Sequence, residues 1–224
     1  MPNKFALIVA GGSGSRMNNE VPKQFLELAG KPVLMHTFEA FYSFDTAIRF
    51  VLVLPESEFQ RWKELCEKHH FNINHHLAAG GSSRFESVKN GLDCIPEDGI
   101  VFIHDGVRPL VSKQTLQNCL DTARVKGNAL PVVPVSESVR YIDGSKNTSL
   151  DRSKYFLVQT PQTFTLSLIK KAYQQPYSEL FTDDASVLEN MGTNIVTVEG
   201  NRENIKITFP EDLRIATLLL QSTR

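Results

Sequence analysis

A glycine-rich turn follows the first apolar segment of the chain and strongly limits how this region can fold. Residues 5–10 are a short apolar run of the length expected for a buried strand. Residues 11–15 are glycine and serine only. Glycine lets the backbone approach a ligand closely, and successive N–H groups in such a turn form an anion-binding concavity. The stretch therefore predicts a phosphate-binding loop directly after a buried strand.

Two cations, Arg16 and Lys23, follow the turn and would bring positive charge to the same anion. Pro22 stiffens the segment that carries Lys23. The pattern lacks the third glycine of a dinucleotide fingerprint, and its Gly-Lys pair at residues 30 and 31 is followed by proline rather than the Ser or Thr of a P-loop. A tight strand–helix turn without a ligand is the alternative that the loop alone leaves open.

Composition narrows the class of protein. The chain has 224 residues, is 41% hydrophobic and carries a net charge of −1. This length suits one domain with a full core, and the balanced charge provides no basic field for nucleic acid. No apolar run approaches the roughly 18 residues of a membrane span, and the short first run does not resemble a signal peptide. The three widely spaced cysteines predict reduced thiols and a cytoplasmic location.

Apolar strands and amphipathic helices alternate along most of the chain, which predicts an α/β fold. After the first strand, strands are expected at residues 48–54, 71–77, 100–104, 129–135, 195–198 and 205–207, and helices at residues 33–44, 56–69, 85–92, 112–126, 165–175, 183–191 and 210–220. We expect residues 1–224 to form a single domain, because no repeat, low-complexity tract or linker interrupts them.

A second glycine turn, at residues 78–84, also follows an expected strand and precedes a helix that carries Ser87. The backbone groups of such a turn are suited to reading the edge of a flat base. An ordinary strand–helix turn is the alternative.

Asp105 lies at the end of the buried strand at residues 100–104 and is followed by Gly106 and Arg108. Open α/β sheets bind ligands at this position. Asp105 could hold Mg²⁺ indirectly or bind a substrate hydroxyl; alternatively, an Asp105–Arg108 ion pair only shapes the turn. The histidine pairs at residues 69–70 and 75–76 are expected to face solvent rather than a metal, because neighbouring side chains on a strand point to opposite faces.

Residues 138–158 predict a β-hairpin arm, since the Asp143-Gly144 pair is a strong hairpin signal. Arg152 is expected on its return strand. The arm has little core of its own to cover, so we expect it to bury against a second subunit. Further along, Lys206 stands between two isoleucines of an expected strand and would face either solvent or a site.

Taken together, these segments resemble the nucleotidyltransferases that join CTP to a polyol phosphate, and most closely the 2-C-methyl-D-erythritol 4-phosphate cytidylyltransferase (IspD) family of the non-mevalonate isoprenoid pathway. The matching pieces are AGGSGSRM with PKQF, GKPVL, AGGSSRFESVKNGL, HDGVRP, the Asp-Arg pair at 151–152, TPQ, TDDAS, and NIKIT followed by PEDL. They span nearly the whole chain in the family's order. The resemblance implies a Rossmann-like, mostly parallel twisted sheet of the nucleotide-diphospho-sugar transferase type, with an arm at about residues 136–160 that builds a homodimer.

The resemblance also implies roles for individual residues. The CTP-binding residues would be Ala10, Gly11, Gly12, Ser13, Gly14, Ser15, Gly80, Gly81, Ser87 and Asp105. The polyol phosphate would be held by Asp105, Gly106, Arg108, Ser138, Arg152, Thr160 and Lys206, with Ser138 and Arg152 reaching in from the partner subunit. The catalytic residues would be Arg16, Lys23, Arg152 and Lys206, and Asp105 would contribute weakly or indirectly to a Mg²⁺ ion bound mainly by the CTP phosphates.

The expected reaction is CMP transfer from CTP to 2-C-methyl-D-erythritol 4-phosphate with release of pyrophosphate. Both reactants are anions, so catalysis needs positioning and charge neutralisation more than covalent chemistry. Three alternatives remain: a ribitol-5-phosphate cytidylyltransferase, a nucleotide-sugar glycosyltransferase, and a non-catalytic CTP-binding protein. The second acid of a D-x-D metal pair, usual in glycosyltransferases of this fold, is missing from HDGVRP.

Overall fold

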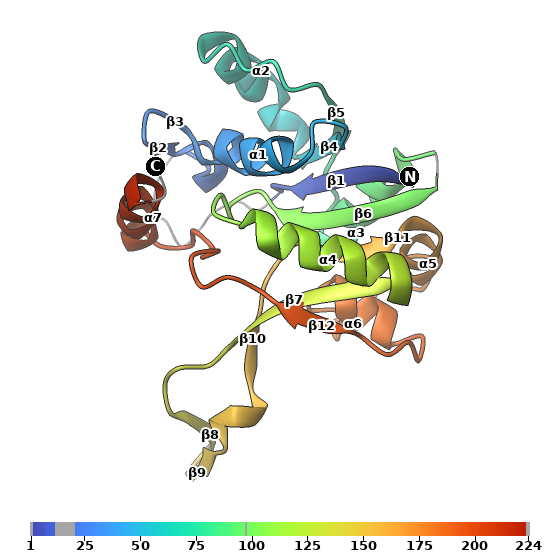
Figure 1. Cartoon of the computed structure of the whole chain (residues 1–224), viewed down its shortest axis with the longest axis vertical. Coiled ribbons are helices and arrows are strands. Elements are labelled where there is room, and N and C mark those ends of the chain that lie inside the picture. The colour runs from blue at the N-terminus through green and yellow to red at the C-terminus, as the bar shows by residue number, and fades with distance from the viewer. Residues whose placement is uncertain (1, 12–20, 97, 223–224) are drawn as a thin grey trace.

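A mixed β-sheet with helices on both faces forms the body of the protein, and a hairpin arm projects from it (Figure 1). The structure is a computed structural model that describes residues 2–11, 21–96 and 98–222. The described residues form an eight-stranded sheet in the order β10-β7-β11-β6-β1-β4-β5, and β12 pairs with β7. Its strands are β1 (Asn3–Val9), β4 (Arg49–Leu54), β5 (His75–Ala79), β6 (Gly99–Asp105), β7 (Asn128–Pro134), β10 (Phe156–Val158), β11 (Gln162–Thr165) and β12 (Thr197–Glu199). The predicted α/β class with a mostly parallel sheet is confirmed.

The parallel half of the sheet has a strand order that creates a crevice between β1 and β6. β4 and β5 lie on one side of β1, whereas β6 lies on its other side. β1 pairs in parallel with both neighbours, and Val9 stands opposite Asp105. Ligands of open α/β sheets bind beyond the carboxyl ends of the strands at such a switch point. The segments that follow β1 and β6 are thereby brought side by side.

Two hydrophobic cores fill the space between the sheet and its helices. In β1, Ala6 and Ile8 face the core formed with α1, α2 and α4, whereas Phe5 and Leu7 face the core formed with α3, α5 and α6. Burial on both faces explains why this strand is apolar throughout rather than alternating. The helices are α1 (Val33–Phe44), α2 (Phe59–Lys68), α3 (Arg84–Asp93), α4 (Lys113–Lys126), α5 (Leu166–Ala172), α6 (Asp184–Glu189) and α7 (Pro210–Ser222), and short 3₁₀ turns occur at Lys23–Phe25 (η2), Glu56–Glu58 (η3) and Arg152–Lys154 (η4). No helix in the described ranges has the length and apolar character needed to cross a membrane.

The strand expected at residues 71–77 begins later, at His75. The preceding residues cross from α2 to the sheet, and Phe71 turns its ring onto Trp62 in an edge contact with centroids 5.5 Å apart. His75 is not solvent-facing as expected, because its Nε2 accepts a hydrogen bond of 2.8 Å from Trp62 Nε1. Packing in the aromatic cluster therefore decides where this strand begins, although the local sequence pattern favours an earlier start. Among the described residues, no group of three potential metal ligands forms near these histidines or elsewhere.

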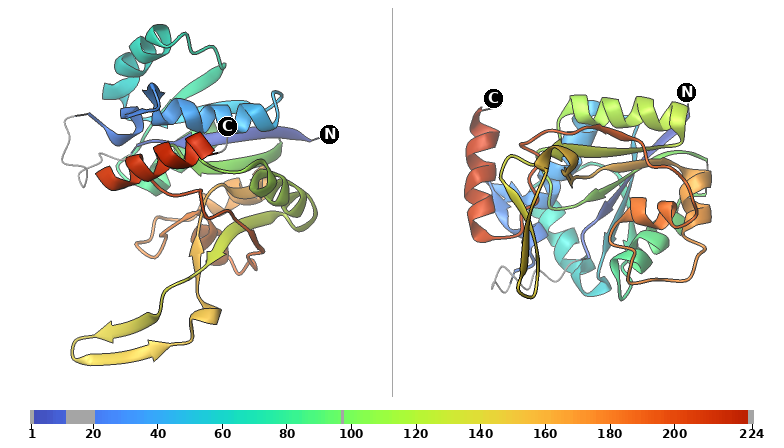
Figure 2. Two further views of the ribbon diagram at one scale, coloured as in Figure 1. Left: turned by 60° about the vertical axis from the view of Figure 1, so that its left-hand side comes forward. Right: turned by 90° about the horizontal axis from the view of Figure 1, so that it is seen from below.

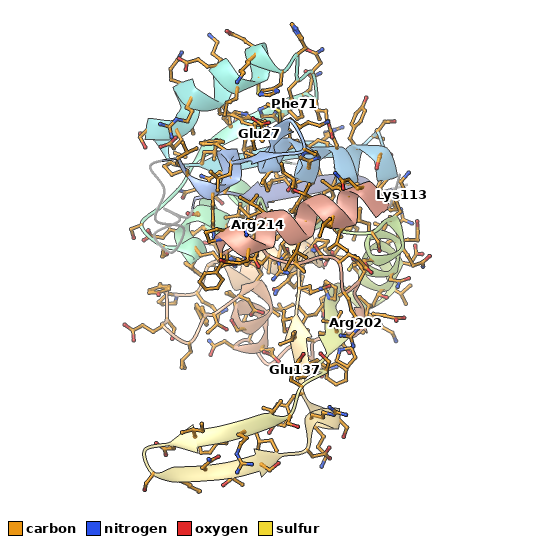
Figure 3. The ribbon with its side chains drawn as sticks, turned by 90° about the vertical axis from the view of Figure 1, so that its left-hand side faces the viewer. Glu27, Phe71, Lys113, Glu137, Arg202 and Arg214 are labelled. Atoms are coloured by element: carbon orange, nitrogen blue, oxygen red, sulfur yellow. The ribbon has the colours of Figure 1, made fainter. Side chains whose placement is uncertain are left out.

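The arm consists of β8 (Val139–Asp143) and β9 (Lys146–Leu150), which pair with each other and not with the main sheet. It extends well away from the body (Figure 2, left), and Glu137 lies at its neck (Figure 3). The expectation that the hairpin runs to residue 158 with Arg152 on its return strand is wrong. Arg152 begins the 3₁₀ turn η4, and β10 pairs antiparallel with β7 at the base of the arm. The return strand of the hairpin is β9, which begins directly after the turn at Gly144, where φ is +57°.

The last part of the chain covers the end of the sheet near the crevice. α7 packs over a small core of Leu28, Val33, Val107 and Ala216, together with Ile207. Leu28 belongs to a two-stranded ribbon of β2 (Glu27–Leu28) and β3 (Lys31–Pro32). The strand predicted at residues 205–207 is wrong: this segment has no strand partner and is anchored through the Ile207 N–H, which donates to the Val107 carbonyl at 2.9 Å.

Gly91 lets α3 approach the sheet closely, and its replacement is expected to destabilise the protein. A Cβ atom there would lie 2.4 Å from Leu7 Cδ1 and 2.8 Å from Val53 Cγ2, both on buried side chains. Gly91→Ala should lower the free energy of unfolding by about 1–2 kcal/mol in urea denaturation, because overpacking outweighs the gain in helix propensity. Asp93→Ala, at an exposed position of the same helix, is the control and should change it by less than about 0.5 kcal/mol. A more stable Gly91→Ala protein would contradict this packing argument.

Candidate active site

A cavity of about 310 Å³ opens where β1 and β6 end. Among the described residues, its lining contains three cations, Lys23, Arg84 and Lys206, and one carboxylate, Asp105. Of the residues predicted from the sequence, it brings together Ala10, Gly11, Lys23, Gly81, Ser87, Asp105 and Lys206. The excess of positively charged side chains in this open cavity suits an anionic ligand.

The first wall of the cavity is the segment that leaves β1. Its backbone is tied to the sheet, because the Ala10 N–H donates to the Val53 carbonyl at 2.9 Å. The buried Gln24 side chain donates to the Ala10 carbonyl at 2.9 Å and so links the Lys23 turn to the same segment. The remaining predicted residues of the loop, Gly12, Ser13, Gly14, Ser15 and Arg16, lie outside the described residues.

The second wall is the glycine turn between β5 and α3. Gly81 donates its N–H to Ser87 Oγ at 3.0 Å, and Ser87 Oγ in turn donates to the Ser83 carbonyl at 2.8 Å. A Cβ at Gly81 would lie 2.3 Å from the Cβ of Glu86, so the turn requires glycine there. Gly80 shapes the turn by donating to the Leu54 carbonyl at 2.8 Å and is not among the cavity-lining residues. The predicted role of Ser87 therefore includes holding the turn in shape.

Asp105 is the electrostatic centre of the site. Its Oδ2 lies 3.0 Å from Lys206 Nζ and 3.2 Å from Arg108 Nε. Burial acts to raise the pKa of Asp105, but Lys206, Arg84 and Arg108 together hold it well below its usual range. The Asp105–Arg108 ion pair weighed as a structural alternative is thus present, and Asp105 also pairs with a cation from a distant segment. The carboxylate stays charged and fixes the position of the Lys206 ammonium group.

Gly106 permits close packing at the turn after β6. Its N–H donates to the Val9 carbonyl at 2.8 Å, and a Cβ there would lie 2.9 Å from Ala10 Cβ. Neither Gly106 nor Arg108 lines the cavity. Gly106 fixes the turn next to Asp105 by its bond to Val9, and Arg108 contacts the Asp105 carboxylate.

Arg84, which is partly exposed to the cavity, forms an ion pair with the fully buried Asp184, and the sequence pattern did not predict this pair. Arg84 donates from both terminal nitrogens to the two Asp184 oxygens, at 2.8 and 2.6 Å. The Tyr173 hydroxyl donates to Asp184 at 2.6 Å. Asp184 is fully buried, so this bidentate contact fixes the guanidinium group where α6 meets the wall of the cavity. Their positions in AGGSSRFESVKNGL and TDDAS were the available signal, but local patterns do not pair residues so far apart.

Thr160 belongs to a buried hydrogen-bond chain behind Asp105 rather than to the cavity lining. The Asp105 N–H donates to Thr160 Oγ1 at 3.1 Å, and Thr160 Oγ1 lies 3.0 Å from His104 Nδ1. His104 Nε2 lies 2.9 Å from the Arg108 carbonyl. A carbonyl can only accept, so Nε2 carries the hydrogen and the neutral ring accepts the Thr160 proton at Nδ1. These hydrogen bonds hold both ends of the turn that carries Asp105, at its N–H and at the Arg108 carbonyl.

Acidification is expected to destabilise the protein through His104. Burial lowers the pKa of His104 from 6.5 to about 4. The unfolded chain takes up a proton that the folded chain refuses, so the stabilisation is complete above pH 6.5 and is lost as the pH falls toward 4. Urea unfolding at pH 7 and pH 4.5 should differ by about 2–3 kcal/mol more in the wild type than in His104→Gln, since each pKa unit corresponds to about 1.4 kcal/mol. An equal pH dependence in the two proteins would contradict this role.

The structure does not bring Ser138 and Arg152 to the cavity of their own chain. Ser138 is exposed next to β8, and Arg152 Nη1 donates to the Ser136 carbonyl at the neck of the arm. The arm extends from the β7–β10 side of the body, at a distance from the ends of β1 and β6 (Figures 1 and 2). Their predicted approach from a partner subunit stays a prediction.

Comparison with known proteins identifies the family. The family model described as 2-C-methyl-D-erythritol 4-phosphate cytidylyltransferase (IspD) matches residues 5–222. The chain belongs to the IspD family. A relative of that name from Phocaeicola vulgatus is 51% identical over 97% of this chain and 100% of its own length, and one from Bacteroides fragilis is 53% identical over 96% and 98%. A crystal structure of 4-diphosphocytidyl-2C-methyl-D-erythritol synthase from Anaerococcus prevotii superposes with a TM-score of 0.83 at 27% identity, covering 98% of this chain and 99% of that one. The resemblance seen in the sequence motifs is confirmed.

The described lining of the cavity offers little to bind a divalent metal on its own. Within the described residues, Asp105 is the one carboxylate in the lining. Lys206 and Arg108 both contact its Oδ2, and neither contact uses Oδ1. Mg²⁺ is commonly bound by one or two carboxylates together with substrate phosphates. The lining therefore fits a metal held mainly by a nucleotide triphosphate, and Asp105 is the described lining residue with a carboxylate to offer.

Proposed function

We propose that this protein, as one nucleotidyltransferase domain, transfers CMP from CTP to 2-C-methyl-D-erythritol 4-phosphate and releases pyrophosphate. The observation that carries the proposal is the cavity at the β1–β6 switch point, whose lining contains Lys23, Arg84, Lys206 and Asp105, in a chain of the IspD family. An oxygen of the polyol phosphate attacks the α-phosphorus of CTP. The bond from the α-phosphorus to the bridging oxygen breaks, and pyrophosphate leaves with that electron pair.

CTP is proposed to lie across the two glycine turns. The turn after β1 receives the phosphates, and the turn that contains Gly81 reads the cytosine with its backbone groups. Ser87 supports this role, because its hydroxyl fixes the Gly81 N–H and the Ser83 carbonyl in one arrangement. A preformed turn loses little conformational entropy when the base binds.

The cations of the cavity are proposed to make the encounter of two anions favourable. Lys23 neutralises charge that develops on the CTP phosphates, and Lys206 holds the attacking phosphate. Asp105 orients the half-exposed Lys206 side chain through their 3.0 Å contact and holds its ammonium group at the cavity. Mg²⁺ would supply further positive charge to the CTP phosphates, and Asp105 is the residue that would help to hold it, weakly or indirectly. The protein contributes alignment and charge at this cavity.

A homodimer is proposed to complete the polyol phosphate site. Exposed apolar side chains gather on the arm and at its base, at Tyr141, Ile142, Tyr155, Phe156, Leu157 and Val158. Burying such a surface favours association with a second copy. Ser138 and Arg152 would then reach the cavity of the partner, where Arg152 would bind the polyol phosphate.

The test is pyrophosphate release by the purified protein with Mg²⁺ and CTP. Separate reactions contain 2-C-methyl-D-erythritol 4-phosphate, ribitol 5-phosphate or neither. We expect release with the methylerythritol phosphate alone. Release only with ribitol 5-phosphate would keep the mechanism and change the substrate. Tight CTP binding without release in any reaction would show a nucleotide-binding protein and overturn the proposal.

A further inference from the structure

Lys206 depends on an irregular segment for its position. The residues around it belong to no helix or strand. The lysine side chain is 44% exposed, yet its Nζ lies 3.0 Å from Asp105 Oδ2. A long, half-exposed side chain holds one place only if its backbone is fixed, because its free rotamers otherwise oppose ordering.

Two anchors fix the backbone on either side of this lysine. On one side, the Ile207 N–H donates to the Val107 carbonyl at 2.9 Å. On the other side, the fully buried Asn204 donates from Nδ2 to the Thr160 carbonyl at 2.8 Å. The Asn204 carbonyl accepts from Arg108 Nη1 at 2.8 Å. Asn204 therefore ties the lysine segment both to Thr160 and to the turn that carries Asp105.

The amide of Asn204 is only half satisfied. Its Oδ1 is buried and has no hydrogen-bond partner among the described residues. A buried polar atom without a partner costs stability, typically about 1–3 kcal/mol. Asn128 offers a contrast within the same chain: its Nδ2 donates to the Asn194 carbonyl at 3.1 Å and its Oδ1 accepts from the Val196 N–H at 2.8 Å. Both polar ends of the Asn128 amide are hydrogen-bonded, whereas Asn204 keeps an unpaired buried oxygen two residues before the lysine that the site needs.

We propose that Asn204 is a positioning residue for Lys206. Its side chain holds the irregular segment against Thr160, so that the ammonium group stands at Asp105 and faces the cavity. This inference rests on the proposed function for the step that Lys206 assists. Losing the anchor moves the lysine without removing it, and displacements of this kind cost about 10–100-fold in activity.

The experiment compares Asn204→Ala with Asn128→Ala. Both variants remove one buried asparagine that joins two chain segments, and Asn128 lies outside the cavity lining. Unfolding is measured first, and kinetics are recorded at a temperature where both variants are folded. We expect kcat/KM for the polyol phosphate to fall about 10–100-fold in Asn204→Ala, with CTP affinity unchanged, and to stay within about threefold of wild type in Asn128→Ala.

Two further measurements separate positioning from loss of structure. In a Lys206→Ala background, adding Asn204→Ala should lower activity by less than about threefold, because residues that act through one another are not additive. A crystal structure of Asn204→Ala should show Lys206 Nζ beyond hydrogen-bond distance of Asp105, a result that needs no substrate. If Asn204→Ala does not fold, Asn204→Leu keeps the side-chain volume and takes its place.

The outcomes are distinct. Wild-type kinetics in a folded Asn204 variant, or additive losses with Lys206→Ala, would overturn the positioning role. An inactive wild-type protein would instead overturn the proposed function, and the Lys206–Asp105 distance in the variant structure would then decide the inference alone.

Discussion

Lys23→Ala is expected to lower kcat by about 10²–10³-fold while the fold stays intact, because it removes one preorganised positive charge from the transition state. The lysine lies on a short 3₁₀ turn and lines the cavity. Its neighbours Gln24 and Phe25 are buried and hold the turn in place, and Phe25 stacks on Trp62. These buried neighbours anchor the backbone of the turn, and Gln24 ties it to the Ala10 carbonyl.

Steady-state pyrophosphate release, with unfolding measured in parallel, tests this expectation. Lys31→Ala is the matched control, because Lys31 is a nearby lysine that pairs with Glu39 and does not line the cavity. The control should retain wild-type kcat. Full turnover by Lys23→Ala would remove the lysine from the proposed chemistry, and unfolding of the variant would contradict the separation of its structural and chemical roles.

Removal of the arm should yield a monomer that still binds CTP and has lost most of its activity toward the polyol phosphate. The neck is narrow, because the Val135 N–H donates to the Tyr155 carbonyl at 3.4 Å. A short Gly-Ser linker can therefore replace residues 137–154. All described cavity-lining residues lie outside this segment, so the CTP site remains. We expect a loss of about 10²-fold or more in kcat/KM, since the partner's positioning groups are gone.

Mass measurement by light scattering and a subunit-mixing experiment test the shared site. Lys23→Ala and Arg152→Ala are each nearly inactive in this scheme. In a heterodimer of the two, one cavity contains Lys23 from its own chain and Arg152 from the other. Random mixing should then restore about a quarter of wild-type activity, as the symmetry of a two-fold dimer requires. No restoration of activity would mean that Arg152 does not act in the cavity of the other chain. A fully active arm-deleted monomer would contradict the shared site altogether.

The sequence predicted those parts of the molecule that depend on local pattern. Continuous apolar runs identified β1, β4 and β6 because both faces of these strands are buried, and the two glycine turns were recognised because each directly follows a strand. Asp105 and Lys206 were both selected, although only the fold brings their charges to 3.0 Å. The loop residues from Gly12 to Arg16 stay predictions.

What the sequence did not predict depends on contacts between distant segments. Arg84 and Asp184 are 100 positions apart and meet only when α3 and α6 pack on the same face of the sheet. Residues 205–207 alternate like a strand, but the segment pairs with no described strand. It is anchored by the Ile207 N–H to the Val107 carbonyl and by the Asn204 side chain to the Thr160 carbonyl. His75 alternates like a surface residue, yet the indole of Trp62 holds it inside an aromatic cluster. In each case the deciding partner lies in another element.

The end of β10 joins two environments within three residues. Val158 is exposed at the base of the arm, whereas Thr160 is buried and accepts a hydrogen bond from the Asp105 backbone. In a dimer formed through this base, as proposed above, ordering of the strand would be coupled to ordering of the Asp105 turn through this hydrogen bond. Linkage is reciprocal, so a ligand that tightens the turn also tightens association. Total protein concentration thereby becomes a variable in the apparent affinity for the second substrate, and dilution alone should weaken its binding.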